Sequence, residues 1–285
     1  MARICIVTDS TADIPKALAE ELSIRIVPLK VHISGETYLD GVNITPTVFF
    51  HKLRTTEQFP TTSQPSPGDF EQVYMELAEE YGQDVQIISI HLSSALSGTY
   101  QSANLAKNMV EPPMDITVVD SKKAAYLLGT IVVQAAKAVK NGKTKEECLE
   151  LVNRMIIGQR EFFVLDTLTY LQKGGRIGKA QAVIGTLLNV KPILSLNEAG
   201  EVYPFDKVRG KKKAMATMIG ELKEYAGNHE VIASILYAMN PEEAEQLKTQ
   251  LEEEFNVSEI ALSEIGPVIG AHVGPNVLAI SMFKV

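Results

Sequence analysis

The fold is decided by an apolar run and the polar segment that follows it: Val85-Gln86-Ile87-Ile88-Ser89-Ile90-His91-Leu92, then Ser93-Ser94-Ala95-Leu96-Ser97-Gly98-Thr99-Tyr100-Gln101-Ser102-Ala103. The run is typical of a parallel strand buried on both faces. Residues 104–107 continue as a helix, so the hydroxyl groups lie where a strand ends and a helix begins. In an open α/β sheet ligands bind at that edge, and free N–H groups at a helix start favour an anion.

The serines of this segment allow two interpretations. One is that Ser93, Ser94 and Ser97 only cap the helix, because serine is a favoured N-cap residue. The other is that they bind a ligand, since three serines, a threonine and Gly98 within seven residues exceed what one cap needs. We favour the ligand. The strand at the N-terminus ends in a similar polar segment, Thr8-Asp9-Ser10, at the same kind of edge.

The composition excludes several classes of protein. The 285 residues are 45% apolar and 22% charged, enough for a sizeable core and two domains. A net charge of −8 argues against a nucleic-acid partner. Cys5 and Cys148 lack metal-ligand spacing, so we expect no metal site. The first residues enter a strand directly and no apolar run approaches the roughly 18 residues of a membrane span, so we expect a soluble cytoplasmic protein.

The two halves of the chain have different patterns. Strands and helices alternate in the first half, which predicts a mainly parallel sheet with helices on both faces. The second half carries a hairpin at 191–206 and further strands near 231–238, 258–262 and 277–283, which predicts an antiparallel α+β domain. We place domains at 1–157 and 158–285, with the boundary between Arg154 and Glu161. The predicted fold class is α/β.

Two loops carry further candidate ligand groups. Residues 59–68 contain three prolines and form a predicted stiff polar loop, in which Thr62, Ser63 and Gln64 offer hydroxyl and amide groups. Residues 265–276 contain three glycines and two prolines around His272, which predicts a non-repetitive path open to a ligand. A helix is expected at about 180–188.

The residues leave more than one chemistry open. There is no Walker A pattern and no G-x-S-x-G elbow. Ser94, His272 and Asp120 are the residues from which a serine hydrolase or acyltransferase would be built. Alternatively, hydroxyls and N–H groups bind a carboxylate while apolar side chains surround an alkyl chain. About fourteen buried methylenes at ~0.8 kcal/mol each would contribute on the order of 11 kcal/mol gross.

Five segments in order resemble the DegV family of bacterial fatty-acid-binding proteins. They are 8–10 (Thr-Asp-Ser), 62–66 (Thr-Ser-Gln-Pro-Ser), 93–103, 171–177 (Leu-Gln-Lys-Gly-Gly-Arg-Ile) and 270–275 (Gly-Ala-His-Val-Gly-Pro). The resemblance implies an N-terminal parallel α/β domain, a C-terminal α+β domain with a split antiparallel sheet, and a buried fatty acid of roughly 14 to 18 carbons between them. It implies no other cofactor.

The resemblance also implies roles for residues. Thr62 and Ser94 would hydrogen-bond the carboxylate, with His272 in the same polar network. Ser93, Ser97, Gly98, Ser63 and Gln64 would form a secondary polar site.

In kinase-linked members of the family the protein is a carrier and not itself an enzyme. It presents the acid to a separate fatty acid kinase, and the acyl phosphate feeds phospholipid synthesis. Lys173, Arg176 and Arg209 would dock that kinase, and the protein would contact membranes peripherally during lipid exchange. A serine hydrolase or acyltransferase using Ser94 and His272 and a lipid-sensing regulatory protein are the alternatives.

Overall fold

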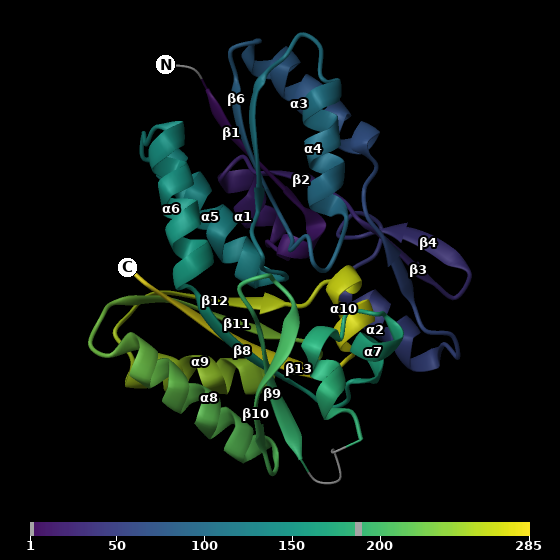
Figure 1. The fold of residues 1–285 in the computed structure, drawn as a ribbon, viewed down its shortest axis with the longest axis vertical. Helices are drawn as coiled ribbons and strands as arrows, with labels where there is room; N and C mark the ends of the chain where they lie inside the picture. Colours follow the sequence, from purple (N-terminus) through teal and green to yellow (C-terminus); the bar gives the residue numbers. More distant parts are fainter. Residues whose placement is uncertain (1–2, 186–189) are drawn as a thin grey trace.

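The predicted strand at 85–92 is strand β6 (Gln86–His91) of a four-stranded sheet (Figure 1). The structure is a computed structural model and describes residues 3–185 and 190–285. The sheet order is β2-β1-β6-β7, with β1 at Ile4–Asp9, β2 at Arg25–Val27 and β7 at Asp115–Asp120. All three pairings are parallel, which confirms the prediction for the first half.

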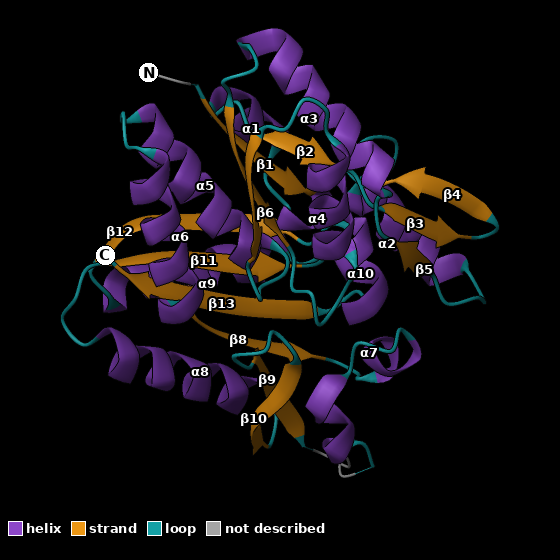
Figure 2. Ribbon diagram, turned by 45° about the horizontal axis from the view of Figure 1, so that its top comes forward, coloured by secondary structure: helices purple, strands orange, loops and turns teal. Residues whose placement is uncertain are grey.

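Helices cover both faces of the parallel sheet (Figure 2). Side chains alternate along β1, so Cys5 and Val7 pack with helices α3 and α4 while Ile6 packs with α5 and α6. The helices of this half are α1 (Lys16–Glu21), α2 (Pro46–Thr55), α3 (Pro67–Tyr81), α4 (Thr99–Met109), α5 (Tyr126–Lys140) and α6 (Lys145–Gly158), with a 3-10 turn η1 at Ser10–Ala12.

A small antiparallel sheet of order β4-β3-β5 extends the first half. Its strands are β3 (Lys30–Ile33), β4 (Glu36–Leu39) and β5 (Thr61–Ser63). Strand β5 and the first two residues of α3, Pro67 and Gly68, lie within the predicted polar loop 59–68, so that prediction is wrong for five residues. Prolines are tolerated beside an edge strand, and β5 is at the edge of this sheet, paired with β3. The pairing of Thr62 with Val31 fixes where the Thr62 side chain lies.

The second half forms a six-stranded sheet of order β10-β9-β8-β13-β11-β12. Four of its pairings are antiparallel, as predicted, but β11 and β12 are parallel because helix α9 crosses between them. The strands are β8 (Arg160–Leu165), β9 (Lys191–Leu196), β10 (Val202–Val208), β11 (Val231–Tyr237), β12 (Val257–Glu264) and β13 (Val277–Lys284).

Helices α8 (Lys211–Ala226) and α9 (Pro241–Glu254) cover one face of this sheet (Figure 1). On the opposite face, Phe163, Leu194 and Ala279 join the core that also contains α5 and α6. The two halves therefore share one apolar core. Within the residues that the structure describes, no helix is both long and apolar enough to cross a membrane.

The segment 265–276 differs from its prediction. It contains a short helix, α10 (Pro267–Val273), which begins with a proline in its first turn and ends at Gly274, whose φ is +79°. A proline at the start of a helix and a glycine after its end are boundary signals, so the sequence contains signals that predict this helix. Residues 169–173 form α7 (Thr169–Lys173), and the helix expected at 180–188 is a 3-10 helix at Gly178–Val183, beyond which residues 186–189 lie outside the described residues.

Candidate functional site

A cavity of about 340 Å³ lies where the two halves of the chain meet. This volume is at the small end of the roughly 300–1,000 Å³ typical of ligand pockets. Most of its lining is aliphatic or aromatic and comes from both halves: Leu29, Leu92, Leu96, Ala124, Ala125, Leu127, Phe163, Leu171, Leu196, Val202, Leu236, Ile265, Val268, Ile269, Val273, Val277 and Ala279.

Two polar side chains of the lining are hydrogen-bonded to each other. The Oγ1 atom of Thr62 lies 2.8 Å from Nε2 of His272, although 210 residues separate them in sequence. Ser63, Gln64, Ser97 and Arg176 are the other polar residues of the lining. The cavity thus combines an apolar wall with one cluster of hydrogen-bonding groups, which suits a ligand with an alkyl part and a polar head.

His272 is neutral near pH 7. Burial, assisted by the positive charge of Arg176, lowers its pKa to about 4. Its second ring nitrogen, Nδ1, is buried and has no hydrogen-bond partner among the residues that the structure describes. A β-carbon at position 174 would lie only 2.2 Å from that nitrogen, so Gly174 is what allows the ring to sit there.

This pKa predicts how stability depends on pH. The histidine protonates near pH 6.5 in the unfolded chain and near pH 4 in the folded protein. The free energy of unfolding is therefore highest above pH 6.5 and decreases as the pH falls from 6.5 to 4. At pH 5 the loss amounts to about 2 kcal/mol. In urea unfolding at pH 7 and pH 5, the wild type is expected to lose about 2 kcal/mol more than His272→Gln. Equal losses would contradict the buried neutral ring.

Arg176 supplies the positive charge of the cavity lining. Its Nε donates to the Leu96 carbonyl at 3.0 Å and its Nη1 donates to the Gly174 carbonyl at 2.6 Å. The guanidinium is half-buried. The resemblance assigned this residue to docking of a kinase, and the structure places it in the lining of the cavity.

Ser93 and Ser94 bond protein groups. The buried Ser93 hydroxyl donates to the Gly200 carbonyl at 2.9 Å, and so joins the two halves. The Ser94 hydroxyl donates to the Asp120 carboxylate at 2.5 Å. Neither is among the residues that line the cavity. The N-cap of α4 is Gly98, so Ser93 and Ser94 do not cap this helix. Ser97 Oγ does accept the N–H of Thr99, the first residue of α4, at 3.3 Å, so the capping interpretation holds for Ser97.

Of the predicted secondary polar residues, Gln64 and Gly98 lie against each other, whereas the side chains of Ser63, Ser93 and Ser97 bond residues outside that set. The Gln64 amide donates to Ser102 Oγ at 3.0 Å. The same side chain packs against Gly98, where a β-carbon would lie 2.2 Å from Gln64 Oε1. The Ser97 hydroxyl lies 2.9 Å from that of Thr99. Ser63 Oγ lies 3.1 Å from His32 Nε2. Gly98 therefore provides space for the polar cluster instead of a ligand group.

The other two predicted docking residues, Lys173 and Arg209, do not line the cavity. The Lys173 ammonium sits 4.0 Å from the centre of the Phe59 ring. Arg209 is exposed and lines a different cavity, of about 630 Å³, together with Asp166 and Lys191.

A serine hydrolase would need the nucleophile bonded to its base. Ser94 is instead bonded to Asp120, and His272 to Thr62. Both bonds would have to break before Ser94 and His272 could act together.

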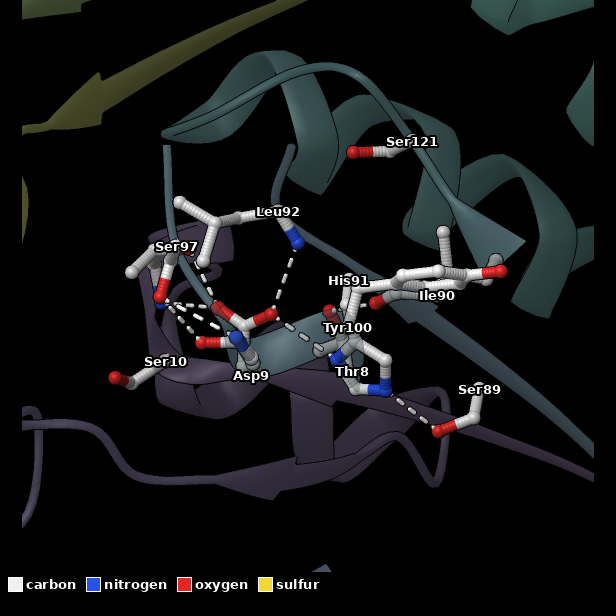
Figure 3. A network of polar contacts seen from close by, with 12 residues as sticks. Thr8, Asp9, Ser10, Ser89, Ile90, His91, Leu92, Ser97, Tyr100 and Ser121 are labelled. Carbon is white, nitrogen blue, oxygen red and sulfur yellow. Dashed lines mark hydrogen bonds and ion pairs between the residues drawn. The ribbon is translucent and has the colours of Figure 1, made fainter. Parts of the chain in front are cut away.

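In the sequence, Asp9 stands out only as a residue at the end of a strand. In the structure it bonds Leu92, which directly precedes the polar segment 93–103, the serine segment (Figure 3). Its fully buried carboxylate accepts the Leu92 N–H at 3.0 Å, His91 Nδ1 at 3.0 Å, and the N–H and hydroxyl of Thr11 at 3.1 and 2.5 Å. His91 Nε2 continues to Ser89 Oγ at 2.7 Å, which lies 2.8 Å from the Tyr74 hydroxyl. Asp9, His91, Ser89 and Tyr74 are all fully buried, so this chain of bonds is screened from water. The same burial raises the pKa of Tyr74 to about 12.

Comparisons with known proteins agree on one family. Residues 3–285 match the family model described as "Uncharacterised protein, DegV family COG1307". A DegV domain-containing protein of Halalkalibacterium halodurans is 38% identical over 284 residues, 99% of each chain.

Solved structures give the same result. "Fatty Acid Binding of a DegV family Protein from Thermus thermophilus" is 39% identical with a TM-score of 0.92, over 99% of this chain and 100% of that one. A fatty acid (stearic acid)-binding protein from Eubacterium ventriosum is 27% identical with a TM-score of 0.88, over 100% and 98% of the two chains.

Proposed function

The chain belongs to the DegV family, and from that membership together with its cavity we propose that it binds one long-chain fatty acid. The observation that carries the proposal is the apolar cavity that ends in the hydrogen-bonded pair Thr62 and His272. Two structural relatives are described as fatty-acid-binding proteins, one of them with stearic acid.

The polar end of the cavity suits a carboxylate. In the tautomer that carries the proton on Nε2, neutral His272 donates to Thr62 Oγ1, and the Thr62 hydroxyl proton is then available to donate to a carboxylate. The guanidinium of Arg176 adds a positive charge without needing to bond the acid directly. The prediction that Ser94 also donates remains part of the proposal, and it requires the Ser94 hydroxyl to turn from Asp120 towards the ligand.

Replacing Thr62 by Val tests this head-group site. The change removes one hydroxyl and keeps the side-chain shape, so a bound carboxylate loses a donor at a cost of about 1–3 kcal/mol. We expect the Kd for palmitate, measured by titration of delipidated protein, to rise about tenfold. Thr61→Val, next to it on β5 but outside the cavity lining, should leave the Kd unchanged. A Kd that is unchanged in Thr62→Val would remove this residue from the site.

We further propose that the protein presents the carboxylate to a separate fatty acid kinase that uses ATP, so that the acyl phosphate can enter phospholipid synthesis. Two basic residues support this. Half-buried Arg176 lines the cavity, and exposed Lys173, three residues before it in the chain, adds a second positive charge to the same segment.

Lys173→Ala tests this docking. With a bacterial fatty acid kinase and ATP, we expect acyl phosphate to form several times more slowly than with the wild type, while the Kd for palmitate stays the same. An unchanged rate of acyl phosphate formation would show that Lys173 does not contribute to docking of the kinase.

A further inference from the structure

A buried ion pair joins the two halves of the chain beside the cavity without lining it. The Lys123 ammonium donates to both carboxylate oxygens of Glu161, at 2.8 and 2.7 Å, and to the Gln159 carbonyl at 3.4 Å. Lys123 is 6% exposed and Glu161 is 3% exposed. Burial raises the pKa of Glu161 even though Lys123 acts in the opposite direction. Removing two charges from water is unfavourable, so stability alone gives little reason to keep such a pair.

The main chain of Lys123 holds the serine segment. Its carbonyl accepts the Ser93 N–H at 2.8 Å, and its own N–H donates to Ser121 Oγ at 3.1 Å. The next two residues, Ala124 and Ala125, line the cavity. One residue therefore contacts the serine segment through its backbone, the cavity wall through its neighbours, and strand β8 through its side chain.

Gln159 adds a second connection in the same place. Its amide donates to the Leu127 carbonyl at 3.3 Å and to Ser281 Oγ at 3.3 Å, so it links the start of α5 to strand β13. Leu127 also lines the cavity. The wall formed by the start of α5 is thus tied to the second sheet by polar groups, where apolar packing alone would permit sliding.

We propose that Lys123 and Glu161 are positioning residues for the fatty-acid site: their ion pair sets the serine segment and the start of α5 at the separation from the second sheet that the ligand needs. This inference rests on the proposed function. Neither residue lines the cavity.

The test separates positioning from general stability by comparing two buried lysines. Lys123→Met breaks the proposed positioning pair. Lys145→Met is the matched control, because Lys145 is 4% exposed and paired with Asp115 at 2.6 Å, but both residues of this pair lie in the first half of the chain, on α6 and β7. Both variants should have a lower Tm. At a temperature well below the lowest Tm, titration of delipidated full-length protein with palmitate should show a Kd raised at least about tenfold for Lys123→Met only.

A double variant gives a second readout. Lys123→Met/Glu161→Met replaces the ion pair by two apolar side chains of similar length, which is expected to restore the Tm. The Kd should remain raised, because flexible methionines do not set a separation.

Three results would overturn the proposal: an unchanged Kd in Lys123→Met, an equal rise in Lys145→Met, or a Kd that recovers with the Tm in the double variant. Failure of the wild type to bind palmitate would refute the proposed function instead.

Discussion

Replacing Ala279 by Phe is expected to weaken palmitate binding about a thousandfold. Ala279 lies on β13, is 5% exposed and lines the cavity. The added ring fills the space of about five ligand methylenes, each contributing ~0.8 kcal/mol, for a loss of ~4 kcal/mol. Because the ring enters an existing cavity, the protein should still fold.

A series of acids of decreasing chain length checks this result. The variant should bind acids shorter by about five carbons almost as well as the wild type does, since these no longer need the filled space. The wild type should prefer the long acids. A variant that weakens all chain lengths equally would show that Ala279 affects folding and that the alkyl chain lies elsewhere.

Replacing Asp9 by Asn is expected to lower the free energy of unfolding by about 3–5 kcal/mol. Asp9 accepts four hydrogen bonds with no exposed surface, and an amide nitrogen would face donors where the carboxylate has an acceptor. The His91 ring would lose its anionic partner as well. Urea unfolding at pH 7 measures the change, with a fall in Tm on the order of 10 °C.

Asp115→Asn is the matched control for this prediction. Asp115 also bonds a basic residue, Lys145, but its own side chain is 55% exposed. Water compensates the exposed Asp115 side chain, and buried Lys145 keeps its hydrogen bond to the Asp115 main-chain carbonyl at 3.3 Å, so the control should lose less than Asp9→Asn, about 1–2 kcal/mol. If the two variants lost the same amount, the buried network of Asp9 would not be what holds the end of β6.

Much of the fold follows from local sequence patterns. The apolar run at 85–92 predicted β6, and the alternation in the first half predicted its parallel neighbours. The helix α10 was missed even though Pro267 and Gly274 mark its ends, because three glycines in twelve residues were weighed as a loop. The parallel edge of the second sheet was missed because strand direction depends on where α9 returns the chain.

The sequence likewise predicted only a part of the candidate site. By itself the sequence determined which segments carry polar groups at strand ends, and the resemblance to a family pointed to Thr62, Ser94 and His272. Only the tertiary structure decided that Thr62 meets His272 across 210 residues, that Ser93 and Ser94 bond protein groups, and that Arg176 lines the cavity. The reason is physical: periodicity and boundary residues act within a few turns of chain, whereas the contents of a cavity depend on how two sheets far apart in sequence pack together.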